Sequence, residues 1–192
     1  LDAKKTLTIP IIASINCIDS NEWTTFAKRI QDAGADALEL NIFIPPTDME
    51  RTGIETEKIY FDIIEKVKKE ITIPISIKIS YFFTNLANMI LRLSQSGTSG
   101  IVLFNRFYHS DVNIDNLSIV PAPIFSAPTD LYQTMRWIAI MSKRANCDLA
   151  ASTGAHDSTS FIKLLLTGAK VVQFTSTLYI HGIPYISKLL TE

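Results

Sequence analysis

The residue best suited to chemistry in this sequence is a lysine set inside an apolar run. Lys78 lies in Ile75-Ser-Ile-Lys-Ile-Ser, where an extended strand would turn it either into the protein interior or toward a covering helix. Burying an ammonium group is costly unless an electron-rich partner meets it. A carbonyl or ring nitrogen of a bound cofactor would meet this need, and so would Glu39 in a structural ion pair. The residue alone leaves both interpretations open.

Two asparagines stand at the ends of other apolar runs. Asn41 and Asn105 each carry a side-chain amide that can both donate to and accept from a planar heterocycle. An Asx turn, in which the side chain only redirects the backbone as it leaves a strand, accounts for the same positions. A heterocyclic ligand and a local turn therefore remain alternatives at this point.

Hydroxyl-rich segments follow the last two apolar runs and precede predicted helices. Ser152-Thr-Gly and Thr175-Ser-Thr could hold a phosphate group through their hydroxyls and backbone N–H groups. The candidate residues are Thr153, Gly154, Thr175 and Ser176. Ordinary helix capping by Ser and Thr is the competing interpretation.

These residues need a framework that gathers strand ends, and the sequence predicts one. Six short runs rich in β-branched residues predict strands over residues 11–15, 37–42, 75–79, 100–105, 148–152 and 170–176. Amphipathic stretches alternate with them, for instance over 21–33 and 57–70. This rhythm predicts an α/β fold of the (βα)8 TIM-barrel type, with about six βα units in a single domain over residues 1–192.

A weak internal repeat supports the barrel interpretation. Gly34, Gly97 and Gly168 each stand between a predicted helix and the strand that follows it, the usual place for a helix-ending glycine. An open, doubly wound sheet is the alternative, but no GxGxxG or P-loop follows the early strands to favour it. Since a closed barrel has eight units in about 250 residues, we expect the chain to be truncated, with two units before Leu1.

Amino-acid composition restricts the class of ligand and the cellular location that we expect. The chain is 47% hydrophobic and 19% charged with a net charge of −1, which favours a small molecule over nucleic acid or an anionic membrane. Cys17 and Cys147 form no CxxC pair, and no Cys/His cluster has metal-ligand spacing. No apolar run approaches the roughly 18 residues of a membrane helix. We therefore expect a cytoplasmic protein without a metal site, and a homodimer, because an incomplete barrel would expose apolar faces.

Five segments taken together resemble the cytosolic, class 1 dihydroorotate dehydrogenases and their relatives. They are Ile11-Ile-Ala-Ser-Ile-Asn, Gly34-Ala-Asp-Ala-Leu-Glu-Leu-Asn, Ile75-Ser-Ile-Lys-Ile-Ser, Leu103-Phe-Asn-Arg and Ser152-Thr-Gly-Ala-His. The resemblance implies a flavoprotein oxidoreductase of pyrimidine biosynthesis, in which FMN takes a hydride from dihydroorotate or a related reduced pyrimidine.

The resemblance also implies roles for single residues. Lys78 would lie beside the N1 and O2 edge of the flavin, and Ser14 and Asn41 would touch the isoalloxazine or the substrate. Asn105 would grip the pyrimidine. The flavin phosphate would be held by Thr153, Gly154, Thr175 and Ser176, at positions where the family prefers Gly-Gly and Gly-Thr.

The sequence departs from the family pattern where proton abstraction occurs. The family carries a cysteine or serine base in the loop after the second of these strands, and Ile44 occupies that position here. General-base catalysis is typically worth about 10² to 10⁴ in rate, so no residue is assigned as catalytic; Ser80, Tyr81 and Thr47 are conceivable substitutes. A glycine pair expected near Ser126 is also absent.

Two other functions follow if these departures are decisive. The chain would be a barrel that has lost catalysis and acts as a flavin- or partner-binding module, or a barrel that binds a phosphosugar without flavin.

Overall fold

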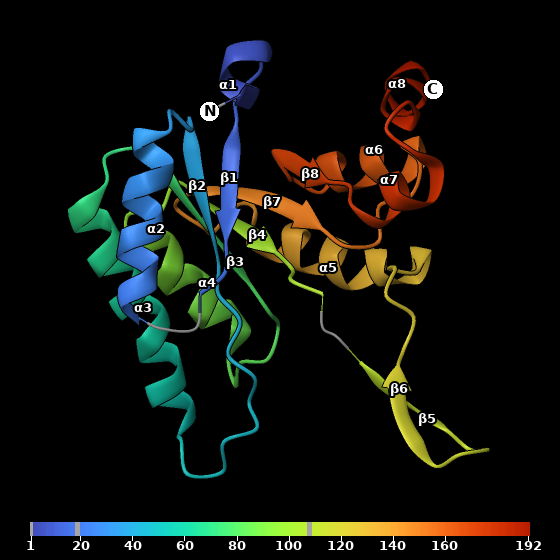
Figure 1. Cartoon of the computed structure of the whole chain (residues 1–192), viewed down its shortest axis with the longest axis horizontal. Helices are drawn as coiled ribbons and strands as arrows, with labels where there is room; N and C mark the ends of the chain where they lie inside the picture. Colours follow the sequence, from blue (N-terminus) through green and yellow to red (C-terminus); the bar gives the residue numbers. More distant parts are fainter. Residues whose placement is uncertain (1, 18–19, 107–108) are drawn as a thin grey trace.

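A single parallel sheet organises the fold. The computed structural model describes residues 2–17, 20–106 and 109–192. Its main sheet has six parallel strands in the order β1-β2-β3-β4-β7-β8, and the sheet curls into a half-barrel (Figure 1). The strands are β1 (Ile12–Ile15), β2 (Ala37–Asn41), β3 (Ile75–Ile79), β4 (Gly100–Leu103), β7 (Asp148–Ser152) and β8 (Val171–Gln173).

Helices alternate with the strands and form a layer around the sheet. They are α1 (Asp2–Thr6), α2 (Ser20–Asp32), α3 (Gly53–Glu70), α4 (Leu86–Gln95), α5 (Leu131–Met141), α6 (Ser158–Leu166), α7 (Ser176–His181) and α8 (Tyr185–Thr191), with a 3-10 turn at Pro128–Asp130. Helix α2 packs on β1 and β2, α5 on β4 and β7, and α6 on β8. The strands of the main sheet follow one another in chain order, without the reversal that a doubly wound sheet has, which confirms the barrel type. Contacts between α2 and α3, α4 and α5, and α5 and α6 link neighbouring helices of the outer layer.

Local sequence signals explain where the helices begin. The backbone N–H of Glu55 donates to the Thr52 hydroxyl, and the Glu55 carboxylate accepts from the Thr52 backbone N–H at 2.8 Å. This capping box starts α3 at Gly53, one turn earlier than predicted. Helix α6 begins after Asp157, whose carboxylate accepts from the Ser160 N–H at 2.7 Å.

The helix-ending glycines behave as the repeat predicts. Gly34, Gly97 and Gly168 have φ angles of 88°, 82° and 112°. L-residues rarely adopt this left-handed conformation, so glycine lets each chain segment leave its helix and enter the next strand directly.

The two faces of the sheet differ in character, as the strand register requires. Leu38, Leu40, Ile77 and Ile101 are fully buried in the core, under the helices. The residues between them point into the barrel interior, where Glu39 stands beside Ser14 and Ser76, and Lys78 beside Asn41 and Val102. The apolar face therefore builds the core, and the polar interior face builds the site.

Some strand ends and one hairpin differ from the predictions. Strand β2 ends at Asn41, β4 at Leu103 and β8 at Gln173, because the apolar residues beyond them pack on the core from loops instead of extending the ladder. The segment after β4, for which no strand is predicted from the sequence, contains an antiparallel hairpin of β5 (Ser110–Asn113) and β6 (Ser118–Pro121). This hairpin projects away from the main sheet (Figure 1).

The half-barrel leaves two edge strands, β1 and β8. Ile12 on β1 is 56% exposed and Val171 on β8 is 51% exposed, so both edges present apolar side chains. Among the described residues, no helix has the length and apolar character needed to cross a membrane.

Candidate functional site

The carboxyl ends of the strands enclose a polar cavity that gathers most of the predicted site residues. This strand-end cavity has a volume of about 210 Å³. Its lining includes six residues named from the sequence, which are Lys78, Asn105, Thr153, Gly154, Thr175 and Ser176. They come from β3 and from the segments that follow β4, β7 and β8, so residues about 100 positions apart converge on one space.

A chain of short hydrogen bonds runs across the barrel interior below this cavity. The Lys78 ammonium donates to the side-chain oxygen of Gln173 at 2.8 Å, and the Gln173 amide nitrogen donates to Glu39 at 2.6 Å. The Ser14 hydroxyl donates to the same carboxylate at 2.7 Å. Lys78 and Glu39 are thus joined through Gln173 rather than in the direct ion pair considered from the sequence.

The electrostatics of Lys78 follow from this position. Burial lowers the pKa of Lys78 below its usual range, and the nearby Glu39 charge opposes that shift. Glu39 itself is only 4% exposed. A desolvated ammonium at the wall of a polar cavity is suited to an electron-rich ligand atom.

The two predicted amides form a pair. The Asn105 side-chain nitrogen donates to the Asn41 side-chain oxygen at 2.8 Å, and the Asn16 amide donates to the Asn41 backbone carbonyl at 2.9 Å. Asn41 also lies opposite Lys78 in the β2–β3 register. Ser14 therefore reaches the site through Glu39, and Asn41 through Asn105.

The segment after β7 has an unusual backbone that its surroundings hold in place. Thr153 and Gly154 have φ angles of 84° and 87°. The Thr153 hydroxyl donates to the Phe104 carbonyl at 3.1 Å, and the Thr134 hydroxyl donates to the Ser152 carbonyl at 2.9 Å. A Cβ atom on Gly154 would stand 2.1 Å from the backbone nitrogen of Leu131, so only glycine fits there.

The loop after β6 crosses the rim of the cavity, where the family's glycine pair is missing. The Ser126 backbone N–H donates to the Ser176 hydroxyl at 2.9 Å, and the Ser126 hydroxyl is 3.0 Å from Nε2 of His156. Arg106 donates to the Pro123 carbonyl at 2.9 Å and approaches Asp130 at 3.8 Å. Hydrogen bonds from side chains thus hold the loop at Ser126 in place, where the family pattern has a pair of glycines.

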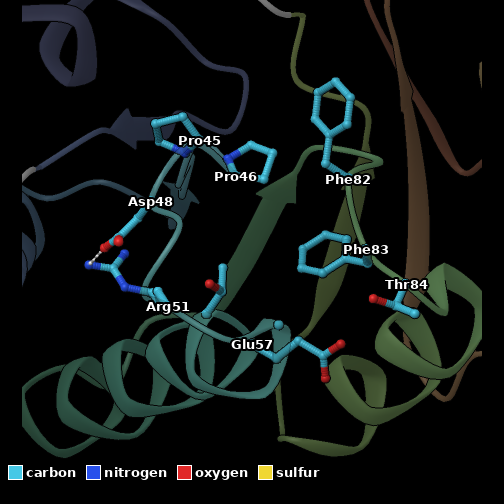
Figure 2. A pocket seen from close by; sticks show the side chains of 10 residues that line it. Pro45, Pro46, Asp48, Arg51, Glu57, Phe82, Phe83 and Thr84 are labelled. Carbon is cyan, nitrogen blue, oxygen red and sulfur yellow. Dashed lines mark ion pairs between the residues drawn. The ribbon is translucent and has the colours of Figure 1, made fainter.

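The loop after β2 begins with an apolar segment that includes Ile44 and two prolines. Ile44 packs against the core, and the two prolines after it face Phe82 and Phe83 across a separate cavity of about 160 Å³ (Figure 2). An ion pair between Asp48 and Arg51, at 3.2 Å, stands at one end of that cavity.

The three residues considered as substitutes for the missing base lie in different surroundings. Ser80 is buried, and its hydroxyl takes part in hydrogen bonds with the Phe82 N–H and with Tyr60. Burial raises the pKa of Tyr60 to about 12. Tyr81 lines a neighbouring cavity together with Asn105, whereas Thr47 is exposed on the loop. These positions favour none of the three as a base in the strand-end cavity.

Comparison with known proteins settles the family. The family model described as "Dihydroorotate dehydrogenase" matches residues 1–192. The chain belongs to the dihydroorotate dehydrogenase family. Curated relatives include the catalytic subunits of dihydroorotate dehydrogenase B (NAD(+)) from Thermoplasma volcanium, 24% identical over 90% of this chain, and from Anoxybacillus flavithermus, 24% identical over 93%. The chain spans 58% of the length of each of these relatives.

A solved structure agrees on the fold of this dihydroorotate dehydrogenase family member. The crystal structure of DHODH in complex with ferulenol from Eimeria tenella superposes with a TM-score of 0.68 at 15% identity. The match covers 97% of this chain and 58% of that one.

Sequence reasoning missed several residues of the site. Gln173 interrupts an apolar strand, a pattern that signals a polar partner in the interior, but the sequence does not say which partner it meets. Ser126 and His156 gave no such signal, because their contact joins two loops 30 residues apart. Within the part of the chain that the structure describes, no group of three His, Cys, Asp or Glu side chains could hold a metal ion.

Proposed function

We propose that this chain forms the cofactor- and substrate-binding part of an FMN-dependent oxidoreductase that acts on dihydroorotate or a related reduced pyrimidine. The observation that carries the proposal is the strand-end cavity, in which six residues selected from the sequence converge. Family membership supplies the reaction type.

The donors around the cavity fit an anionic, heterocyclic cofactor. Among the described residues, two cationic side chains, Lys78 and Arg106, line it together with several hydroxyl groups, and no carboxylate does. Such a set suits a phosphate at one end and an electron-rich ring edge at the other. When bound, FMN would supply hydride-accepting chemistry that no side chain has.

The chain's own residues would bind and orient the reactants. Thr153, Gly154, Thr175 and Ser176 would hold the phosphate end through hydroxyls and backbone N–H groups. Lys78 would stabilise negative charge at the opposite end. The amides of Asn41 and Asn105, fixed against each other at 2.8 Å, would fit the alternating donors and acceptors of a pyrimidine.

The proton that leaves the reduced ring needs an acceptor, and Ile44 cannot be one. We therefore propose that oxidation of dihydroorotate is slow in this protein, by the factor of about 10² to 10⁴ that a general base contributes. A substrate with a more acidic proton would be affected less.

The test is an absorption spectrum of the protein purified at its natural full length, followed by anaerobic addition of dihydroorotate. A flavin band that bleaches slowly is the expected result. A flavin band that dihydroorotate leaves unchanged, while other reduced pyrimidines bleach it, would correct the substrate. Failure to bind FMN, even when it is supplied, would refute the proposal.

A second candidate, a flavin-binding module without catalysis, is favoured by one observation: Ile44, at the position of the family's base, packs against the hydrophobic core. Lys78→Ala separates the two candidates. In an enzyme, the substitution lowers the rate of flavin reduction. In a module without catalysis, no reduced pyrimidine bleaches the flavin, whether in the unmodified protein or in Lys78→Ala.

We also propose that the isolated chain self-associates as a homodimer, because edge strands β1 and β8 expose Ile12 and Val171. Light scattering that shows a stable monomer would refute this.

A further inference from the structure

Gln173 occupies a position that the proposed roles do not explain. Its side chain lies between a carboxylate and an ammonium group, donating to Glu39 at 2.6 Å and accepting from Lys78 at 2.8 Å. The three residues come from β8, β2 and β3, so the contact spans the barrel interior rather than neighbouring strands. Glu39 is 134 positions away from Gln173 in the sequence.

The two charges determine how the Gln173 amide is oriented. If the amide were reversed, its NH2 group would face the Lys78 ammonium and its oxygen would face the Glu39 carboxylate. Both contacts would then be repulsive, whereas the observed orientation makes both attractive and charge-assisted. The amide dipole therefore extends the influence of the Glu39 charge to Lys78.

Lys78 has a physical need for this support. Of its two neighbours in the register, Val102 is apolar and 3% exposed, and the side-chain oxygen of Asn41 already accepts from Asn105. Burial disfavours the charged form of Lys78, and the Glu39 charge favours it. A lysine side chain is also long and flexible, so without a fixed acceptor its head group would sample several positions.

We propose that Gln173 is a positioning residue, which couples Glu39 to Lys78 and thereby keeps the Lys78 ammonium charged and directed into the strand-end cavity. This inference deepens the proposed function, because a charged Lys78 would raise the reduction potential of a flavin bound there. The first part concerns only the chain's own residues and can be tested without cofactor.

The first experiment measures the titration of the Lys78 ammonium by NMR in protein labelled with 15N-lysine, with the signal assigned by its loss in Lys78→Arg. Gln173→Met keeps the side-chain length but removes both hydrogen bonds. We expect the titration midpoint to fall by on the order of one pH unit, since a hydrogen bond to a charged group contributes about that much. Glu39→Gln should lower it in the same direction.

The decisive variant exchanges the two groups. Glu39→Gln combined with Gln173→Glu moves the carboxylate next to Lys78 and leaves an amide on β2. If charge coupling is the role of Gln173, this double variant restores or raises the midpoint, whereas a merely packing role predicts no rescue. Arg106, which lines the same cavity as Lys78, is unchanged in every variant. Differences in the Lys78 midpoint therefore report the changes at Glu39 and Gln173. Gln95, the last residue of α4, is exposed, so Gln95→Met is the matched control for an unrelated glutamine.

The second experiment measures the reduction potential of bound FMN in the same variants. Gln173→Met should shift it to a more negative value, and the exchange variant should reverse that shift. An unchanged Lys78 midpoint in folded Gln173→Met overturns the inference, even if FMN binds. If Gln173→Met does not fold, an unchanged Lys78 titration midpoint in Glu39→Gln overturns the inference instead. Absence of FMN in the unmodified protein refutes the proposed function, and the NMR titration still decides the role of Gln173.

Discussion

Substitution of Gly154 by alanine tests how closely the helix α5 segment approaches the cavity backbone. The added Cβ would lie 2.1 Å from the Leu131 nitrogen and 2.6 Å from its Cα, so the start of α5 would have to move. A left-handed conformation costs an L-residue about 1–2 kcal/mol, and overpacking costs about 1–3 kcal/mol. We therefore expect Gly154→Ala to lower the free energy of unfolding by roughly 2–5 kcal/mol, the sum of these two contributions.

A matched control separates the two contributions. Gly34 has a φ of 88°, against 87° for Gly154, but a Cβ there would meet only the Lys4 side chain at 3.9 Å. Gly34→Ala should therefore suffer the conformational cost alone. Urea denaturation of both variants measures the difference, which we expect to be about 1–3 kcal/mol. Equal destabilisation of the two variants would refute the close approach, and with it the fixed backbone at this wall of the cavity.

Other predictions concern catalysis, substrate binding and pH. Ile44→Cys should raise the rate of dihydroorotate-dependent flavin reduction by about 10² to 10⁴, and unchanged stopped-flow rates would place the base elsewhere. Asn105→Ala removes the bond to Asn41 and should weaken pyrimidine binding by about tenfold, with FMN content unchanged. Asp157→Ala should cost about 0.5–2 kcal/mol at neutral pH. The Ser160 N–H lowers the pKa of Asp157 in the folded state. The stability that Asp157 contributes should therefore be complete above about pH 4, the pKa of an unfolded aspartate, and should be lost as the pH falls through the lower pKa of the folded state. Urea denaturation of both proteins at neutral pH and at a pH below the folded-state pKa would show this.

The parts of the fold that could be predicted from the sequence are those encoded over short distances. The six strands follow from runs of β-branched residues, and the glycines at 34, 97 and 168 mark the helix ends because a left-handed residue is needed at each. The cavity residues could be predicted for a related reason. In parallel barrels the carboxyl ends of all strands meet on one face, so polar residues at strand ends converge without any knowledge of their contacts.

The features that the sequence did not reveal depend on contacts over long distances. The bond from Gln173 to Glu39 exists only because the sheet curls until β8 faces β2, and no local pattern specifies that curvature. The hairpin of β5 and β6 was missed because its exposed residues, such as Ile119 at 78%, have no buried face to impose a clear alternation.

The strained backbone at Thr153 bears on whether this site is functional or decayed. The resemblance places glycine at this position, yet the threonine that replaces it keeps a φ of 84°. Such a conformation costs a non-glycine residue on the order of 1–3 kcal/mol and persists only where the surroundings determine it. Here the Thr153 hydroxyl bonds to the Phe104 carbonyl, and Gly154 is held against Leu131. The shape of the cavity wall is therefore maintained by its neighbours even after the side chain has changed. The loop at Ile44, by contrast, has an isoleucine packed against the core at the position where the family pattern has a cysteine or serine base. The proposed binding wall therefore keeps its shape, whereas the proposed proton-transfer position lacks the chemistry. This asymmetry is why we expect flavin binding to survive in full and oxidation of dihydroorotate to be the impaired step.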